Sequence, residues 1–146
     1  MKVLSLIVLT LLMSKSCSNQ AQKDLANSVI QYTADSRGFH LKIIIANQKA
    51  TIAQGTGTEN PSQVIPIADA DWKELVTEFQ KTNLEEIPNL KDPTQKRFYD
   101  GAAIANLKIR YQDKNYETVA FDHGFPPTAI EKLVNKIVSL AKQKDE

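Results

Sequence analysis

The chain has 146 residues, with 18 basic and 17 acidic side chains, so its formal net charge at pH 7 is +1. This near balance argues against binding to nucleic acid or to anionic lipid by bulk charge, because both need a surplus of Lys and Arg. One cysteine cannot form a disulfide within the chain, and the length fits one domain with its own hydrophobic core.

The first sixteen residues have the pattern of a secretory signal peptide. Lys2 gives a short positive region, an apolar stretch covers residues 3–13, and small polar residues follow. Because a transmembrane helix needs roughly twenty apolar residues, we predict that residues 1–16 are removed on export. Lys2 and Lys15 leave with that segment, so the remaining chain has 16 basic and 17 acidic residues and a balance of −1.

Cys17 stands where a lipoprotein signal peptide places the cysteine that becomes lipid-modified. Ser16 suits the preceding position, whereas Ser14 and Lys15 depart from the usual pattern. We predict lipidation, because a lone cysteine here has no disulfide partner, and hence a protein anchored by lipid on the periplasmic side or the outer surface of a membrane. The alternative is ordinary cleavage and a secreted soluble protein, since Ser14 and Ser16 also satisfy the small-residue rule.

Residues 18–27 are polar and lack turn or strand signals, which predicts a tether between the anchor and the fold. Apolar and polar residues then alternate over 28–54, with turn residues at 36–38, and this pattern predicts a meander of three strands. Residues 63–67 predict a short edge strand, because Pro66 lacks the N–H that a central strand needs.

The rest of the chain predicts a helix, a second hairpin and a second helix. We expect Asp69 or Asp71 to cap the first helix, with Asp71 and Glu74 as a capping-box pair. The second hairpin is predicted over residues 105–122 around a turn at 113–115, and Thr128 is expected to cap the final helix with Glu131 as its box partner. The first helix has its apolar stripe at i, i+3, i+4 and i+7, namely Trp72, Leu75, Val76 and Phe79.

Two hairpins, each followed by a helix, predict an α+β fold in which two helices pack on one face of an antiparallel β-sheet. We expect one domain over residues 28–142, followed by a polar tail at 143–146. The other sheet face is expected to be mostly polar, as is typical of a solvated surface. It would carry Lys42, Ile44, Lys108, Arg110, Glu117 and Val119.

The segment from Leu84 to Ala103 holds about seventeen residues without predicted regular structure, and loops of that length in compact domains tend to be functional. It ends in a run, residues 96–101, with two cations, two aromatic rings, an acid and a glycine. Arg and Tyr are common at binding hot spots, which favours a binding role for this run. In the structural alternative, the two aromatic rings plug the core and Arg97 pairs with Asp100 to pin the loop.

His123 follows Asp122 where the last strand meets the final helix. Neighbours on a strand point to opposite faces, so these two side chains cannot form a dyad with each other. One alternative makes His123 the general base of a hydrolase or isomerase, oriented by Asp100. In another, Asp122 and His123 make turn and cap hydrogen bonds. The binding site that we predict comprises Arg97, Tyr99, Asp100, His123 and Arg37.

The residues after the signal segment predict no metal site, no cofactor and no nucleophilic catalyst. The chain has two histidines, His40 and His123, without the spacing of metal ligands. No Gly-x-Ser-x-Gly motif is present. Gly55-x-Gly57 precedes a proline rather than a helix, which does not fit a phosphate-binding loop.

Three segments resemble small uncharacterised exported lipoproteins of Bacteroidota envelopes: residues 96–107, residues 121–127 and the Asp69-x-Asp71-Trp72 motif. The resemblance covers residues 32–140 and implies lipid anchoring in the cell envelope, but no activity, because none is assigned to the family. The leading hypothesis is a non-catalytic module that binds an envelope protein or peptide. An inhibitor of an exported enzyme remains a further alternative.

Overall fold

A computed structural model describes residues 19–57 and 59–143. The predicted signal peptide, the predicted lipidation site Cys17 and residues 144–146 of the predicted tail lie outside the described residues. Within the described ranges, no helix combines the length and the apolar character needed to span a bilayer.

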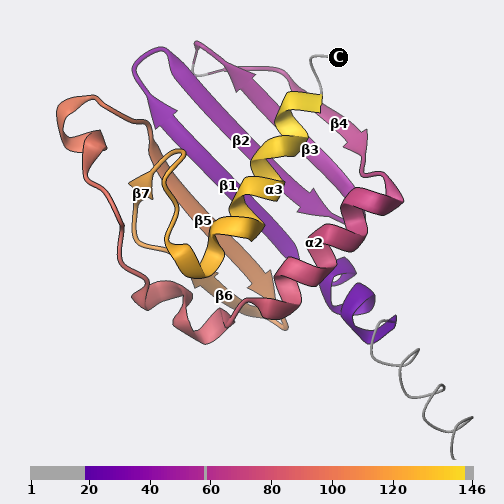
Figure 1. Cartoon of the computed structure of the whole chain (residues 1–146). Helices are drawn as coiled ribbons and strands as arrows, with labels where there is room; N and C mark the ends of the chain where they lie inside the picture. The colour runs from indigo at the N-terminus through magenta and orange to yellow at the C-terminus, as the bar shows by residue number, and fades with distance from the viewer. Residues whose placement is uncertain (1–18, 58, 144–146) are drawn as a thin grey trace, which may run out of the picture.

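Seven antiparallel strands form one sheet, which confirms the predicted α+β class (Figure 1). Their order is β4-β3-β2-β1-β5-β6, and β7 pairs with β5 on the side where β6 also pairs. As predicted from Pro66, the strand that contains this residue lies at an edge. The strands are β1 (Val29–Ser36), β2 (Phe39–Ala46), β3 (Lys49–Gly55), β4 (Ser62–Pro66), β5 (Ile104–Tyr111), β6 (Lys114–Glu117) and β7 (Phe121–Asp122).

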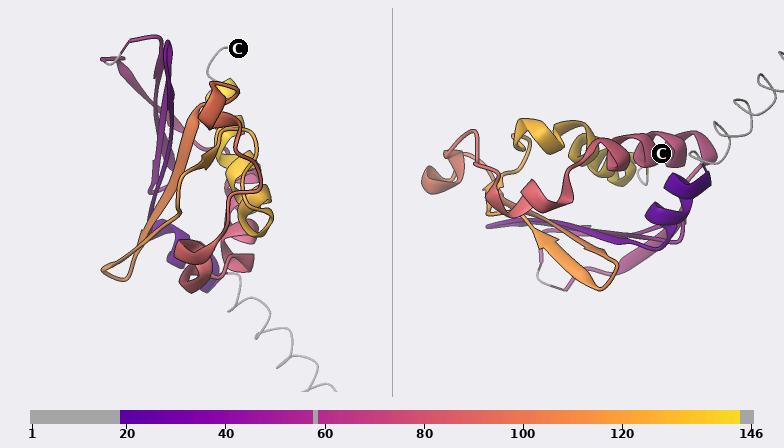
Figure 2. Two further views of the ribbon diagram at one scale, coloured as in Figure 1. Left: turned by 90° about the vertical axis from the view of Figure 1, so that its left-hand side faces the viewer. Right: turned by 90° about the horizontal axis from the view of Figure 1, so that it is seen from below.

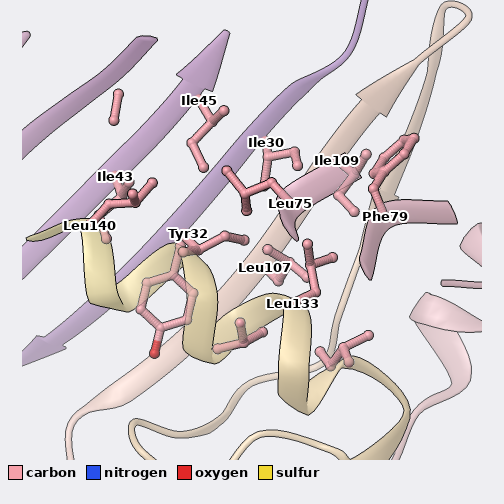
Figure 3. Close-up of a cluster of buried hydrophobic side chains, with 14 of the residues drawn as sticks. Ile30, Tyr32, Ile43, Ile45, Leu75, Phe79, Leu107, Ile109, Leu133 and Leu140 are labelled. Atoms are coloured by element: carbon pink, nitrogen blue, oxygen red, sulfur yellow. The ribbon is translucent and has the colours of Figure 1, made fainter. Parts of the chain in front are cut away.

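Two helices, α2 (Asp69–Lys81) and α3 (Glu131–Lys142), cover one face of the sheet, as Figure 2 shows. The core lies between these two layers. Figure 3 shows Ile30 and Tyr32 of β1 among apolar side chains from β2, β5 and both helices. All four residues of the predicted stripe in α2 are buried, because the period of 3.6 residues keeps them on the side that faces the sheet.

The predicted tether is instead part of the fold. Residues 19–26 are helical, and the side chains of Ala21 and Leu25 pack into the core with 2% and 1% of their surface exposed. The hydroxyl of Ser28 donates to the carbonyl of Leu25 at 2.8 Å and closes the end of this helix. The sequence does not predict this helix because only three residues in ten are apolar, two of them alanine, and they give a weak apolar stripe. The folded domain therefore includes residues 19–27.

The two predicted capping boxes do not form. No side chain caps α2, and both Asp71 and Glu74 instead contact Lys136 Nζ of α3, at 2.6 and 2.7 Å. The final helix begins at Glu131 after a 3₁₀ turn, η3 (Thr128–Ile130), and it also lacks a side-chain cap. In α2, a cation on the neighbouring helix offers the carboxylates a stronger partner than a backbone N–H group does.

The predicted returning strand is broken into β6 and β7 by a bulge. Thr118 fills the bulge: its backbone N–H donates to the carbonyl of Leu107, and its hydroxyl accepts from the N–H of Leu107, both at 3.0 Å. β7 then rejoins β5 through the pair Ile104 and Asp122. This path carries His123 to the end of the sheet where β1 turns into β2 (Figure 1).

Candidate functional site

A pocket of about 580 Å³ opens at that end of the sheet. Three of the five predicted site residues, Arg37, Asp100 and His123, lie around it. They come from the β1–β2 turn, from the segment before β5, and from the residue that follows β7. The full lining is Ser36, Arg37, Phe39, Asp100, Gly101, Ala102, Ala103 and His123.

Arg97 does not line this pocket. Its side chain is only 10% exposed, and its guanidinium lies 2.8 Å from Asp92 and 3.1 Å from Asp122. It therefore pins the segment before β5, as the structural alternative expects, but through partners other than Asp100. Asp100 is exposed and ends the 3₁₀ helix η2 (Lys96–Tyr99) with a left-handed φ of 59°.

Asp122 is fully buried and organises the same segment. Its carboxylate accepts from the Thr94 hydroxyl at 2.5 Å, from the backbone N–H groups of Lys96 and Arg97 at 2.6 and 3.1 Å, and from the guanidinium. It thus caps η2 from a distant part of the chain. Burial alone would raise the pKa of this carboxyl, but the bonds from Thr94, Arg97 and Lys96 outweigh burial and lower the pKa to about 2.

His123 is held from the core side of the pocket. Its Nδ1 lies 2.7 Å from the hydroxyl of the fully buried Tyr32, and its ring centroid lies 5.4 Å from that of Phe39. Burial raises the pKa of Tyr32, and burial together with the charge of Lys142 lowers the pKa of His123. Tyr32 therefore orients the ring, in place of the Asp100 that the hydrolase or isomerase alternative requires.

Large apolar side chains in the segments that form this end of the molecule remain exposed. The expectation that Phe98 and Tyr99 plug the core is wrong, because they are 71% and 72% exposed. Ile104 and Phe125 are 54% and 40% exposed. The rings are braced by cations, since the guanidinium of Arg97 lies 4.5 Å from the Phe98 ring centroid and Lys96 Nζ lies 3.9 Å from that of Phe125.

The structure also reveals a pair that sequence reasoning missed. His40 Nδ1 lies 2.9 Å from Asp35 Oδ1, in a hollow of about 830 Å³ beside Thr33 and Lys42, under the loop that follows β3. The turn at 36–38 was a usable signal, because a tight turn there places Asp35 opposite His40 in the hairpin register.

Residues 19–57 and 59–143 contain no group of three or more His, Cys, Asp or Glu side chains that could hold a metal ion. Neither a protein-family model nor a curated protein matches the chain. The likeness to envelope lipoproteins therefore stays a prediction, and the function has to be argued from the pocket and its rim.

Proposed function

We propose that this protein is a non-catalytic module that binds a protein or peptide partner at the end of the sheet where the pocket lies. One observation carries the proposal: Phe98, Tyr99, Ile104 and Phe125 are 40–72% exposed in the segments that build the pocket end. Exposed apolar groups with a polar rim are typical of interaction sites. We name the three rings among them, those of Phe98, Tyr99 and Phe125, the aromatic rim.

The contacts that hold the backbone beneath the aromatic rim favour an ordered binding surface over a flexible loop. The buried ion pair of Arg97 and Asp122 fixes the backbone of η2, so Phe98 and Tyr99 are held outward before any partner arrives. A surface that is ordered beforehand loses less conformational entropy on binding. Rigid aromatic side chains beside charged groups are also the usual composition of binding hot spots.

The proposal includes the cellular setting inferred from the sequence. The protein is exported, anchored to a membrane by lipid at Cys17, and its partner is an envelope protein or peptide. The signal-peptide pattern supports export, and the balance of −1 after residue 16 supports attachment through lipid rather than through a basic surface.

A cross-linking pull-down from cells that produce the protein tests the binding role. The test variant replaces Phe98 and Tyr99 by Ser, because both side chains are exposed and their loss leaves the core intact. Val64→Ser is the matched control, since Val64 is 59% exposed on β4 at the opposite edge of the sheet. Wild type and control should recover a common partner that the double variant loses. Recovery of the same proteins by all three, or of none by the wild type, contradicts the proposal.

A further inference from the structure

The proton of the His123 ring can be placed from its surroundings. The Tyr32 hydroxyl is fully buried, and the hydrogen bond found for it joins it to His123 Nδ1. If Nδ1 donated, the hydroxyl proton would need a second buried acceptor, and an unpaired buried donor is costly. Tyr32 therefore donates and Nδ1 accepts. A neutral imidazole that accepts at Nδ1 carries its proton at Nε2.

The Nε2–H group is then available to a ligand in the pocket. Nδ1 faces Tyr32 in the core, and Nε2 lies on the other side of the ring. His123 lines the pocket and is partly exposed. Burial and the charge of Lys142 lower the pKa of His123, which favours the neutral ring and therefore the N–H at Nε2 as a donor. The pocket thus contains a hydrogen-bond donor without a charge of its own.

Arg37 supplies a cation at the same pocket. It is exposed in the β1–β2 turn, and none of the ion pairs found in the described part of the chain includes it or Asp100. A cation and an anion therefore line one hollow without an ion pair between them. The planar fork of a guanidinium matches the two oxygens of a carboxylate.

We propose that the pocket binds a carboxylate of a peptide partner between the guanidinium of Arg37 and the Nε2–H of His123. Asp100 accepts an amide N–H of the same peptide, and the Phe39 ring packs against an adjacent apolar side chain. The negative charge of Asp100 repels a doubly charged phosphate more strongly than a singly charged carboxylate. The pocket therefore selects the carboxylate. This inference rests on the proposed function and names the ligand chemistry of the same site.

The carboxylate has two sources, the C-terminus of a chain and an acidic side chain, and small probes separate them. N-acetylphenylalanine presents a terminal carboxylate, the α-amide of N-acetylglutamate presents a side-chain carboxylate, and N-acetylphenylalanine amide presents none. Titration of the isotope-labelled full chain, followed by NMR, should shift the signals of Arg37 Nε–H and the His123 ring with a carboxylate probe. The amide should bind about tenfold more weakly or worse, because a charge-assisted bond is lost.

Arg37→Gln should weaken binding of the carboxylate probe about tenfold, and because Arg37 is exposed the variant keeps its fold. Arg110→Gln is the matched control, since Arg110 is 65% exposed and pairs with Asp113 in another hairpin. Equal binding of the amide overturns carboxylate recognition, and so does the absence of shifts with both carboxylate probes at about 20 mM, well above a millimolar dissociation constant. The pull-down decides the proposed function separately, because it depends on Phe98 and Tyr99.

Discussion

Asp122 and His123 are neighbours in the sequence but act on opposite sides of β7. The carboxylate of Asp122 faces the segment before β5 and holds η2, while the ring of His123 faces Tyr32 and the pocket. This division follows from the alternation of side chains along a strand. The same alternation ruled out a dyad from the sequence alone. The last residue of β7 thus supports the rim, and the residue that follows β7 lines the pocket.

Asp122→Asn should lower the free energy of unfolding by about 2–4 kcal/mol at pH 7, because the guanidinium of Arg97 and the capped N–H groups lose a buried charged acceptor. Urea denaturation measures this change. Asp113→Asn is the control, since the Asp113 side chain is 99% exposed and should have little effect. Equal stability of the two variants would show that the buried carboxylate does not hold the segment.

The same carboxylate predicts how stability depends on acid. Its pKa in the folded protein is lowered to about 2, below the value of about 3.9 for an unfolded Asp. The unfolded chain therefore binds more protons at acidic pH, so the contribution of Asp122 is fully present above pH 4 and is lost as the pH falls toward 2. Unfolding free energies measured at pH 5 and pH 2.5 should differ more for the wild type than for Asp122→Asn.

Tyr32→Phe should cost about 1 kcal/mol in unfolding free energy and should release the His123 ring from its single tautomer. In the wild type, the nitrogen chemical shifts of the ring should report a proton at Nε2. Removal of the hydroxyl also removes a hydrogen bond to the neutral form, so the pKa of His123 should rise in the variant. A wild-type ring with its proton at Nδ1 would contradict both the assigned donor and the carboxylate site.

At the scale of elements, local patterns predicted the layout and missed what depends on distant partners. The stripe of α2 and the hairpin turns are local signals, and they predicted the sheet and both helices. The short helix η2 had no such signal, because its cap, Asp122, lies 26 residues from Lys96. Three of the predicted site residues meet at one pocket, but the buried position of Arg97 depends on Asp92 and Asp122, which the sequence does not show to be close.

The helical segment 19–26 gives a test at the same scale. Leu25→Ala should lower the unfolding free energy by about 2–5 kcal/mol, the usual cost of emptying a fully buried leucine site. Gln22→Ala is the control, because Gln22 is exposed on the same helix and should change stability by about 0.5 kcal/mol or less. A tether would tolerate both substitutions equally. Equal stabilities of the two variants would therefore show that this segment does not contribute to the fold.

The molecule as a whole has two distinct ends. The segment 19–26 lies at one end of the sheet, and the β1–β2 turn and η2 lie at the other (Figure 1). The β1–β2 turn contributes to the pocket, and η2 carries two rings of the aromatic rim. β1 connects them, running from Val29 beside the helical segment to Ser36 at the pocket, which is roughly 23 Å for a strand of this length. Because the helical segment packs on the core, the fold extends to within two residues of Cys17. Under the proposed anchoring, no long tether separates the domain from the membrane.

This geometry predicts which end faces the bilayer. The lipidated chain from Cys17 onward, placed in a nanodisc that contains a paramagnetic lipid, should lose NMR signal intensity at Gln22 and at the β2–β3 turn residue Gln48, which border the same hollow. Gly101 and Gly124, at the pocket end, should keep their intensity, because paramagnetic broadening falls steeply over a distance of roughly 23 Å. The chain with Cys17→Ser is the control and should show no selective loss. Broadening at Gly101 instead would show that the aromatic rim faces lipid. The exposed rings would then be a membrane contact rather than a binding site for a peptide.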